Sequence, residues 1–185
     1  MPIPLPITKT KIDTTVWGIP VTNALNTLTD TSVPGLNSRL TALENKIAGI
    51  TNMFRGTTTG QNLPVGVYEP VILTAENVDS GNWHSTSTNP NRVTPNIPGW
   101  YVAIFHAEVT GLAITDRVAT AIDVNGVASV RDDRQAGISN PDLSISTAVL
   151  LNGTTDYISS SVYHSSATAK TLNVASLAVF LVRPT

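Results

Sequence analysis

The chain has 185 residues, of which 13% are charged and none is cysteine, and its formal net charge is −2. This length holds one full domain and an extension, and the charge gives no general attraction to nucleic acids or anionic membranes. Without cysteine, disulfides and thiolate metal sites are excluded. Another source of stability, such as oligomerisation, is therefore expected.

Residues 1–35 carry apolar side chains that have no local partner. Pro2, Pro4 and Pro6 exclude a helix at the start and favour an extended segment. The segment has no basic n-region, so it is not a signal peptide. No window of the sequence is long and apolar enough to span a membrane, so we expect a protein made in a cytoplasm without membrane insertion. Two interpretations remain open: a disordered tail, or an arm that anchors the chain on another protein through Ile3, Leu5, Ile7, Trp17 and Ile19.

A short helix is predicted within this arm, over about residues 20–29. Pro20 suits a first helical turn, and apolar residues recur after it at helical spacing. The sequence Ser-Val-Pro-Gly at 32–35 ends the helix.

A coiled-coil neck is predicted over residues 36–52. Glu44 and Lys46 fall at the e and g positions, where ion pairs form between helices. Two heptads cannot hold chains together alone, so the neck requires a larger contact nearby. The alternative is a surface helix packed on its own domain. The apolar seam has spacings of 4, 3, 4 and 3 and consists of Leu36, Leu40, Leu43, Ile47 and Ile50.

The pattern changes at about residue 53 to short runs of period 2, separated by Gly, Pro, Asn and Thr. Asn125-Gly126 lies between two such runs and is the strongest hairpin signal in the chain. Seven or more short strands without helices predict an all-β sandwich or barrel over 53–185. The predicted strands are 65–75, 99–110, 117–124, 127–131, 143–151, 156–164 and 172–183.

The last predicted strand, 172–183, is apolar on both faces, and the strand at 99–109 behaves alike. Such a strand is expected to be buried on both sides. In a sandwich one face belongs to the core, and a subunit interface is the simplest cover for the other. We therefore predict a homotrimer whose interface combines the neck seam with Leu177, Val179 and Leu181.

Candidate catalytic and metal-binding residues are few. His106 and Glu108 lie two apart on one strand face, which fits a metal or general-base pair but is more typical of polar residues at a strand end. Asp132 and Asp133 beside two arginines fit either a calcium site or a salt-bridged loop. His84 and His164 have no partner in a Ser-His-Asp arrangement, because no Gly-x-Ser-x-Gly elbow exists. We predict no catalytic, cofactor-binding or metal-binding residue.

Trp83 and Asn152 each have a functional interpretation beside a structural one. Trp83 fits either sugar stacking or packing on its own hairpin. Asn152-Gly-Thr154 matches a glycosylation acceptor, but without a signal peptide a turn is expected.

Residues 53–185 resemble the complement-type globular head domain found in phage virion proteins. The resemblance rests on Asp79-Ser-Gly-Asn-Trp-His84, Asn89-Pro-Asn-Arg-Val-Thr94, Pro98-Gly-Trp-Tyr101, Ile122-Asp-Val-Asn-Gly126, Thr147-Ala-Val-Leu-Leu151, Asp156-Tyr-Ile158 and Ala178-Val-Phe-Leu-Val182. It implies a ten-stranded jelly roll like that of tumour necrosis factor, which forms tight trimers. Gly153-Thr-Thr-Asp156 departs from the family, where Gly and Asp are adjacent, so the geometry of this turn is open.

The front of the chain resembles the amino-terminal segment of fibre and minor tail proteins of actinobacterial phages. The residues that carry this resemblance are Lys11-Ile-Asp-Thr-Thr-Val-Trp-Gly18 and Val21-Thr-Asn-Ala-Leu25. Together the two resemblances imply a trimeric virion protein, attached to other virion proteins by residues 1–35, whose head binds a glycan or protein of the host surface. The alternatives are a capsid decoration or head fibre and, from another class, a polysaccharide depolymerase, which the missing acid/base pair disfavours.

Overall fold

The computed structural model describes residues 40–41 and 52–185 of the chain. Leu40 and Thr41 are helical, whereas residues 52–185 form strands, turns and bends without a helix. Within these two ranges no helix has the length and hydropathy needed to cross a bilayer. The strands are β1 Met53–Leu63, β2 Glu69–Pro70, β3 Ala75–Asp79, β4 Gly99–Thr110, β5 Arg117–Val124, β6 Val127–Gln135, β7 Asp142–Leu151, β8 Ile158–His164 and β9 Lys170–Pro184.

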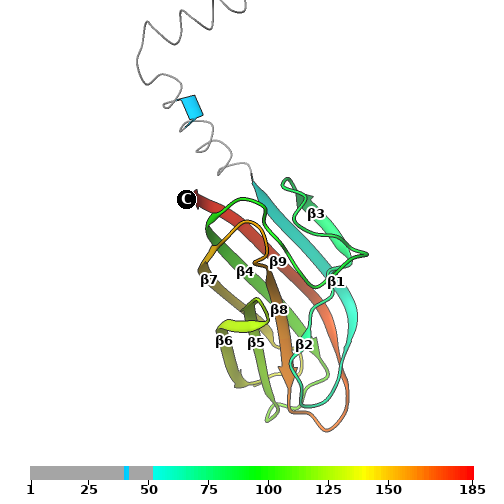
Figure 1. Cartoon of the computed structure of the whole chain (residues 1–185). Coiled ribbons are helices and arrows are strands. Elements are labelled where there is room, and N and C mark those ends of the chain that lie inside the picture. Colours follow the sequence, from blue (N-terminus) through cyan, green and yellow to red (C-terminus); the bar gives the residue numbers. More distant parts are fainter. Residues whose placement is uncertain (1–39, 42–51) are drawn as a thin grey trace, which may run out of the picture. The chain divides into compact units, whose positions relative to one another are not determined.

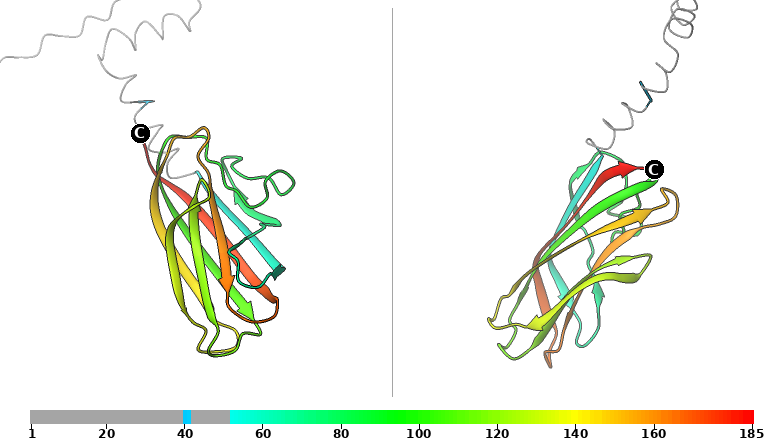
Figure 2. Two further views of the ribbon diagram at one scale, coloured as in Figure 1. Left: turned by 60° about the horizontal axis from the view of Figure 1, so that its bottom comes forward. Right: turned by 90° about the vertical axis from the view of Figure 1, so that its left-hand side faces the viewer.

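The strands form two antiparallel sheets, which Figure 1 and the two views of Figure 2 show as the layers of a sandwich. The five-stranded sheet has the order β3-β1-β9-β4-β7, and the four-stranded sheet has the order β2-β8-β5-β6. The first long strand therefore pairs with the last, and β9 lies at the centre of its sheet. This order is that of a jelly roll, so the predicted all-β sandwich is confirmed for residues 53–185.

Side chains alternate between inward and outward positions along each strand, and the inward ones form the core between the sheets. In β4 the side chains of Tyr101, Phe105 and Val109 point inward and are fully buried, while the residues between them face outward. On β9, Leu177 lies opposite Phe105 and Leu172 lies opposite Val109, so inward side chains from neighbouring strands share one layer. Burial of such side chains contributes about 1.5–3 kcal/mol each, which makes this layer the main stabilising element of the sandwich.

The strands from β4 to β9 were predicted within a few residues, but β1 and β3 were not predicted. In β1 two of the inward positions are Gly56 and Thr58, so the strand lacks the apolar alternation that marks a half-buried strand. Gly56 is required there because a Cβ would lie 2.6 Å from the ring of Phe54. The predicted strand at 65–75 is mostly loop, with only Glu69–Pro70 paired to β8 and with Ala75 opening β3.

Two adjacent turns lie at the same end of the sandwich: the β5–β6 turn lies within the four-stranded sheet, and the β7–β8 turn connects the two sheets. Asn125 and Gly126 have φ values of 54° and 79°, as the two-residue hairpin turn between β5 and β6 requires. In the turn after β7, the Oδ1 atom of Asn152 accepts hydrogen bonds from the backbone N–H groups of Thr154 and Asp156, at 2.9 and 3.1 Å. Gly153, with φ of 70°, is packed so closely that a Cβ would lie 2.3 Å from the backbone nitrogen of Pro98. The Gly-Thr-Thr-Asp sequence thus forms a tight, internally bonded turn.

Stability at high pH is expected to depend on Tyr101. Burial raises the pKa of its hydroxyl from 10.0 to about 12, and this hydroxyl donates a hydrogen bond to the Ile97 carbonyl at 2.5 Å. Because the unfolded chain releases this proton first, stability is lost as the pH rises from about 10 to about 12. The free energy of unfolding, measured across this interval, should fall more steeply for the unmodified protein than for Tyr101→Phe. Parallel pH profiles would contradict this assignment.

Candidate functional site

The outward face of the five-stranded sheet carries an apolar surface near the start of β1 and the end of β9. On β4, Trp100 is 44% exposed and Ile104 is 41% exposed, and Val102 lies between them on the same face. Val102 pairs with Phe180 of β9 on one side and with Ala148 of β7 on the other. We call this surface the apolar face; its residues are Met53, Trp100, Val102, Ile104, Ala148, Leu150, Ala178, Phe180 and Val182.

The apolar face changes to a polar surface further along the same strands. The Nε2 atom of His106 on β4 lies 3.2 Å from the Asp142 carboxylate on β7. Two residues on, Glu108 accepts a hydrogen bond of 3.0 Å from the side-chain amide of Asn173. His106 and Glu108 are therefore both engaged with neighbouring strands, as polar residues at a strand end. The two ends of this sheet thus differ in chemistry, and the apolar end has the character of an interaction surface.

The three β9 residues that the sequence placed in a subunit interface lie in the core of the single chain. Leu177 and Val179 are fully buried and Leu181 is 4% exposed, all three within the core between the two sheets of one chain. Both faces of β9 are apolar, so its sequence alone did not decide which one points inward. The residues between them point outward, of which Phe180 is half-buried and Val182 is 61% exposed.

Most of the predicted neck and anchor residues lie outside the described part of the chain. Leu40 is described, and it is helical and 50% exposed, so its side chain is available for a contact. The neck residues Leu36, Leu43, Ile47 and Ile50 and the anchor residues Ile3, Leu5, Ile7, Trp17 and Ile19 belong to the ranges that the structure does not describe. Their roles stay predictions.

The histidines and the tryptophan considered for catalysis, metal binding or sugar binding are engaged in contacts within the fold. His84 lies 2.8 Å from Glu76 and 3.0 Å from the Pro90 carbonyl, and the buried His164 contacts the Leu63 carbonyl at 3.0 Å. Trp83 is 2% exposed and donates a hydrogen bond from Nε1 to Asn96, so its ring has no face free for a sugar. Among the residues described, no three acidic or histidine side chains gather around a possible metal ion.

Asp132 and Asp133 lie in strand β6 rather than in the predicted loop. The Asp133 carboxylate forms an ion pair with Arg117 of the adjacent strand β5, and the guanidinium of Arg117 holds the pKa of Asp133 below its ordinary value. The Asp132 carboxylate lies 3.6 Å from the guanidinium of Arg134 on the same strand. These exposed pairs contribute little to stability, but they neutralise the two acidic side chains on this strand.

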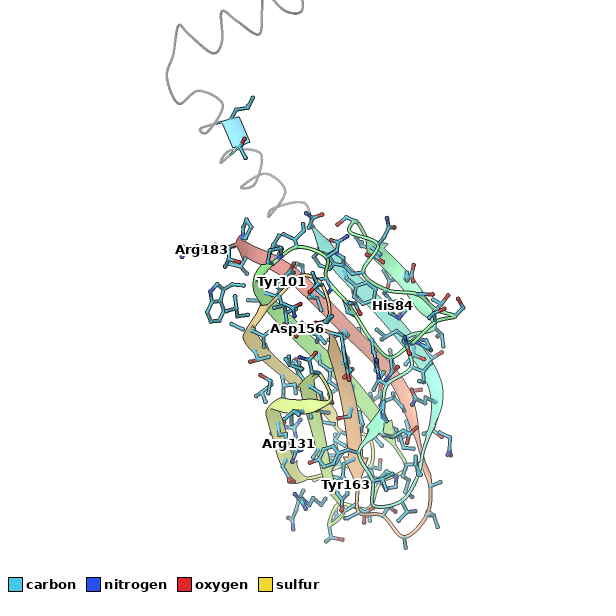
Figure 3. The ribbon with its side chains drawn as sticks, viewed as in Figure 1. His84, Tyr101, Arg131, Asp156, Tyr163 and Arg183 are labelled. Atoms are coloured by element: carbon cyan, nitrogen blue, oxygen red, sulfur yellow. The ribbon has the colours of Figure 1, made fainter. Side chains whose placement is uncertain are left out.

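A second surface was not anticipated from the sequence: a recess of about 330 Å³ on the outer face of the four-stranded sheet. Figure 3 labels Arg131, which lines it on β6, and the neighbouring Tyr163 of β8. Arg131 lies over the ring of Tyr68 at 4.8 Å, and Arg92 lies over the ring of Tyr157 at 4.2 Å. These residues come from four separated segments, so no local motif marks them in the sequence.

No protein-family model and no curated protein matches this sequence. Among solved structures, the PRD1 vertex protein P5 is 12% identical with a TM-score of 0.55, and the match covers 73% of this chain and 99% of that one. Murine APRIL, in a crystal structure at pH 8.5, is 13% identical with a TM-score of 0.49, covering 70% of this chain and 100% of that chain. The likeness to the vertex protein supports the jelly-roll fold.

Proposed function

We propose that this chain is a non-enzymatic structural protein of a phage virion. In this proposal it forms a homotrimer, is attached to other virion proteins by residues 1–35, and turns its jelly-roll head toward the host surface. The observation that carries the proposal is the apolar face, which a single chain leaves exposed on the five-stranded sheet.

A second and third copy of the same chain are the proposed cover for the apolar face. A cyclic assembly buries the same face of every subunit around one axis. The outward side of this sheet is apolar at one end and polar at the other, and this asymmetry fixes how each subunit is oriented in the assembly. The aromatic residues Trp100 and Phe180 are the expected anchors, since large aromatics dominate interface energetics. The predicted neck seam, which includes Leu40, is a second proposed contact between subunits.

A binding role rather than catalysis is favoured by the chemistry of the recess. Hydrolysis of a glycosidic bond generally requires two carboxyl groups, one on each side of the bond. Asp123 is the single carboxyl group among the described residues that line the recess. One carboxylate with hydroxyl, guanidinium and tyrosine groups suits recognition of a ligand without turnover.

Attachment through the arm is tested by deleting residues 1–35. The prolines hold the arm extended, which reduces the entropy lost when it docks in an apolar groove of a partner. The truncated protein should form a folded trimer by light scattering but should be absent from purified virions assembled with it in place of the full-length protein. Trp17→Ala should lower incorporation as well, because Trp17 is the largest apolar side chain of the arm.

A capsid decoration or head-fibre role is the second candidate. It is favoured by the structural likeness to a protein named for its position at a vertex. Normal incorporation of the truncated protein would indicate attachment through the jelly roll, and this second role would then replace the fibre role. Immunogold labelling of virions would separate the two by showing the protein on the head or on the tail.

A further inference from the structure

The floor of the recess includes small side chains of strand β8. Ser159 and Ser161 line the recess and are only 6% and 5% exposed, and Asp123 of β5 also lines it. Larger residues on the neighbouring segments rise above them: Tyr68 and Pro70 from the β2 segment and Arg131 from β6. The sheet therefore forms a hollow with a polar floor instead of a filled surface.

Two guanidinium groups are held at the walls by aromatic rings. Arg131 lies over Tyr68 and Arg92 lies over Tyr157, in the geometry of cation–π contacts. The ring restrains the guanidinium in each contact, and a guanidinium carries five N–H donors. Both cations are therefore positioned before any ligand arrives, which lowers the entropy lost on binding.

Within residues 40–41 and 52–185, neither guanidinium meets a carboxylate at ion-pair distance. The Nε atom of Arg92 is buried and has no hydrogen-bond acceptor in this part of the chain. A buried donor without an acceptor is unfavourable, so a ligand that supplies an acceptor to Arg92 is favoured in the recess. By contrast Arg117, on the same sheet, is fully engaged by Asp133.

Asp123 adds an acceptor at the floor of the recess. Its carboxylate accepts a hydrogen bond of 2.9 Å from the Ser161 hydroxyl, and burial raises its pKa above the ordinary value. The other carboxylate oxygen of Asp123 has acceptor capacity for donors such as sugar hydroxyls. The recess thus combines two guanidinium donors with one carboxyl group and with hydroxyl groups, which suits a ligand that carries one anionic group beside hydroxyls.

The Tyr157 wall is fixed by the two turns at this end of the sandwich. Asn125 accepts a hydrogen bond from the Tyr157 backbone N–H at 3.0 Å and donates one to Asp156 at 2.8 Å. Gly126 packs beside the Tyr157 hydroxyl, where a Cβ would lie at 3.3 Å. Figure 3 labels Asp156, which belongs to this clamp. The wall is thus part of the folded scaffold and does not need a ligand to form it.

We propose that the recess binds an acidic monosaccharide unit of the hexuronic acid class. The carboxylate of the sugar accepts hydrogen bonds from Arg92 and Arg131, and its hydroxyls contact Asp123 and Ser159. A volume of about 330 Å³ is at the lower end of the range for small-molecule sites, about 300–1,000 Å³, which suits one sugar ring. The inference rests on the proposed function, because the four-stranded sheet lies opposite the apolar face and stays open in the proposed trimer.

The test uses full-length protein and saturation-transfer NMR with matched probes. Methyl β-D-glucuronide, galacturonate and mannuronate are compared with methyl β-D-glucopyranoside, which keeps the ring and lacks the carboxylate. At least one uronate should bind about tenfold more tightly than the neutral glucoside, a difference of one tenfold step in Kd. The double variant Arg92→Gln/Arg131→Gln should lose this binding. Arg117→Gln, a charge change on the same sheet outside the recess, should retain it.

Several results would overturn the inference. Equal binding of the neutral glucoside would show that the ligand need not be anionic. Tighter binding of glucose 6-phosphate would assign the recess to a sugar phosphate. Binding that persists in the double variant, or absence of binding by all three uronates, would remove the site. A separate assay, competition of the purified protein with phage adsorption to host cells, tests host binding itself. Competition without uronate binding would leave the proposed function standing and this site refuted.

Discussion

Replacing Val102 with Asp is expected to convert the assembled protein into folded monomers. Val102 lies at the centre of the apolar face, between Phe180 and Ala148, and points away from the core. A carboxylate buried there without a partner costs several kcal/mol, whereas in the monomer it is solvated. Light scattering should give one times the chain mass of 19.6 kDa for the variant and three times this mass for the unmodified protein, with the same β-sheet circular dichroism.

Val127→Asp is the matched control for this experiment. Val127 is 72% exposed on β6, in the opposite sheet, and the substitution is chemically identical. The control variant should remain trimeric. A trimer in both variants would exclude the apolar face as the interface, and monomers in both would point to a general effect of charge.

Leu177→Ala should have the largest effect on stability. Leu177 is fully buried between the sheets, opposite Gly56 on β1 and Phe105 on β4. Truncation of a buried leucine leaves a cavity and lowers the free energy of unfolding by about 2–5 kcal/mol. Denaturant unfolding at one fixed protein concentration measures this loss, and the folded fraction should still sediment as a trimer.

The control for the core is Ile138→Ala, since Ile138 is 60% exposed in the connection after β6. This variant should lose no more than about 0.5 kcal/mol of the free energy of unfolding, as for most surface substitutions. If Leu177→Ala instead changed the oligomeric state and left stability unaltered, then Leu177 would belong to the interface, as its sequence pattern had predicted.

The sequence predicted the sandwich because the strands from β4 to β9 are long, alternating and bounded by turn residues. Asn125-Gly126 gave the β5–β6 hairpin correctly, since few other residue pairs tolerate two positive φ values in succession. β1 was not predicted because Gly56 and Thr58 occupy inward positions in it. Glycine suits position 56 because the ring of Phe54 fills the space beside it, and this compensation is visible only in three dimensions.

The candidate sites were predicted less well, for a different physical reason. On β9 the alternation is clear, but both faces are apolar, so the pattern gives two faces without saying which one is inside. The recess depends on Tyr68, Arg92, Asp123, Arg131 and Tyr157, which the fold brings together from distant segments. Such a cluster has no spacing in the sequence that distinguishes it from ordinary surface residues.

The central position of β9 has a consequence for the order of events during synthesis. β1 and β4 both pair with β9, the last of the described strands, and do not pair with each other. Until residues 170–184 leave the ribosome, β1 and β4 lack the strand that joins them, and their unpaired edges are open to other chains. Long-range pairing of this kind also slows folding. The nascent chain therefore depends on β9 to close the five-stranded sheet, so this sheet can form only after residues 170–184 have been synthesised.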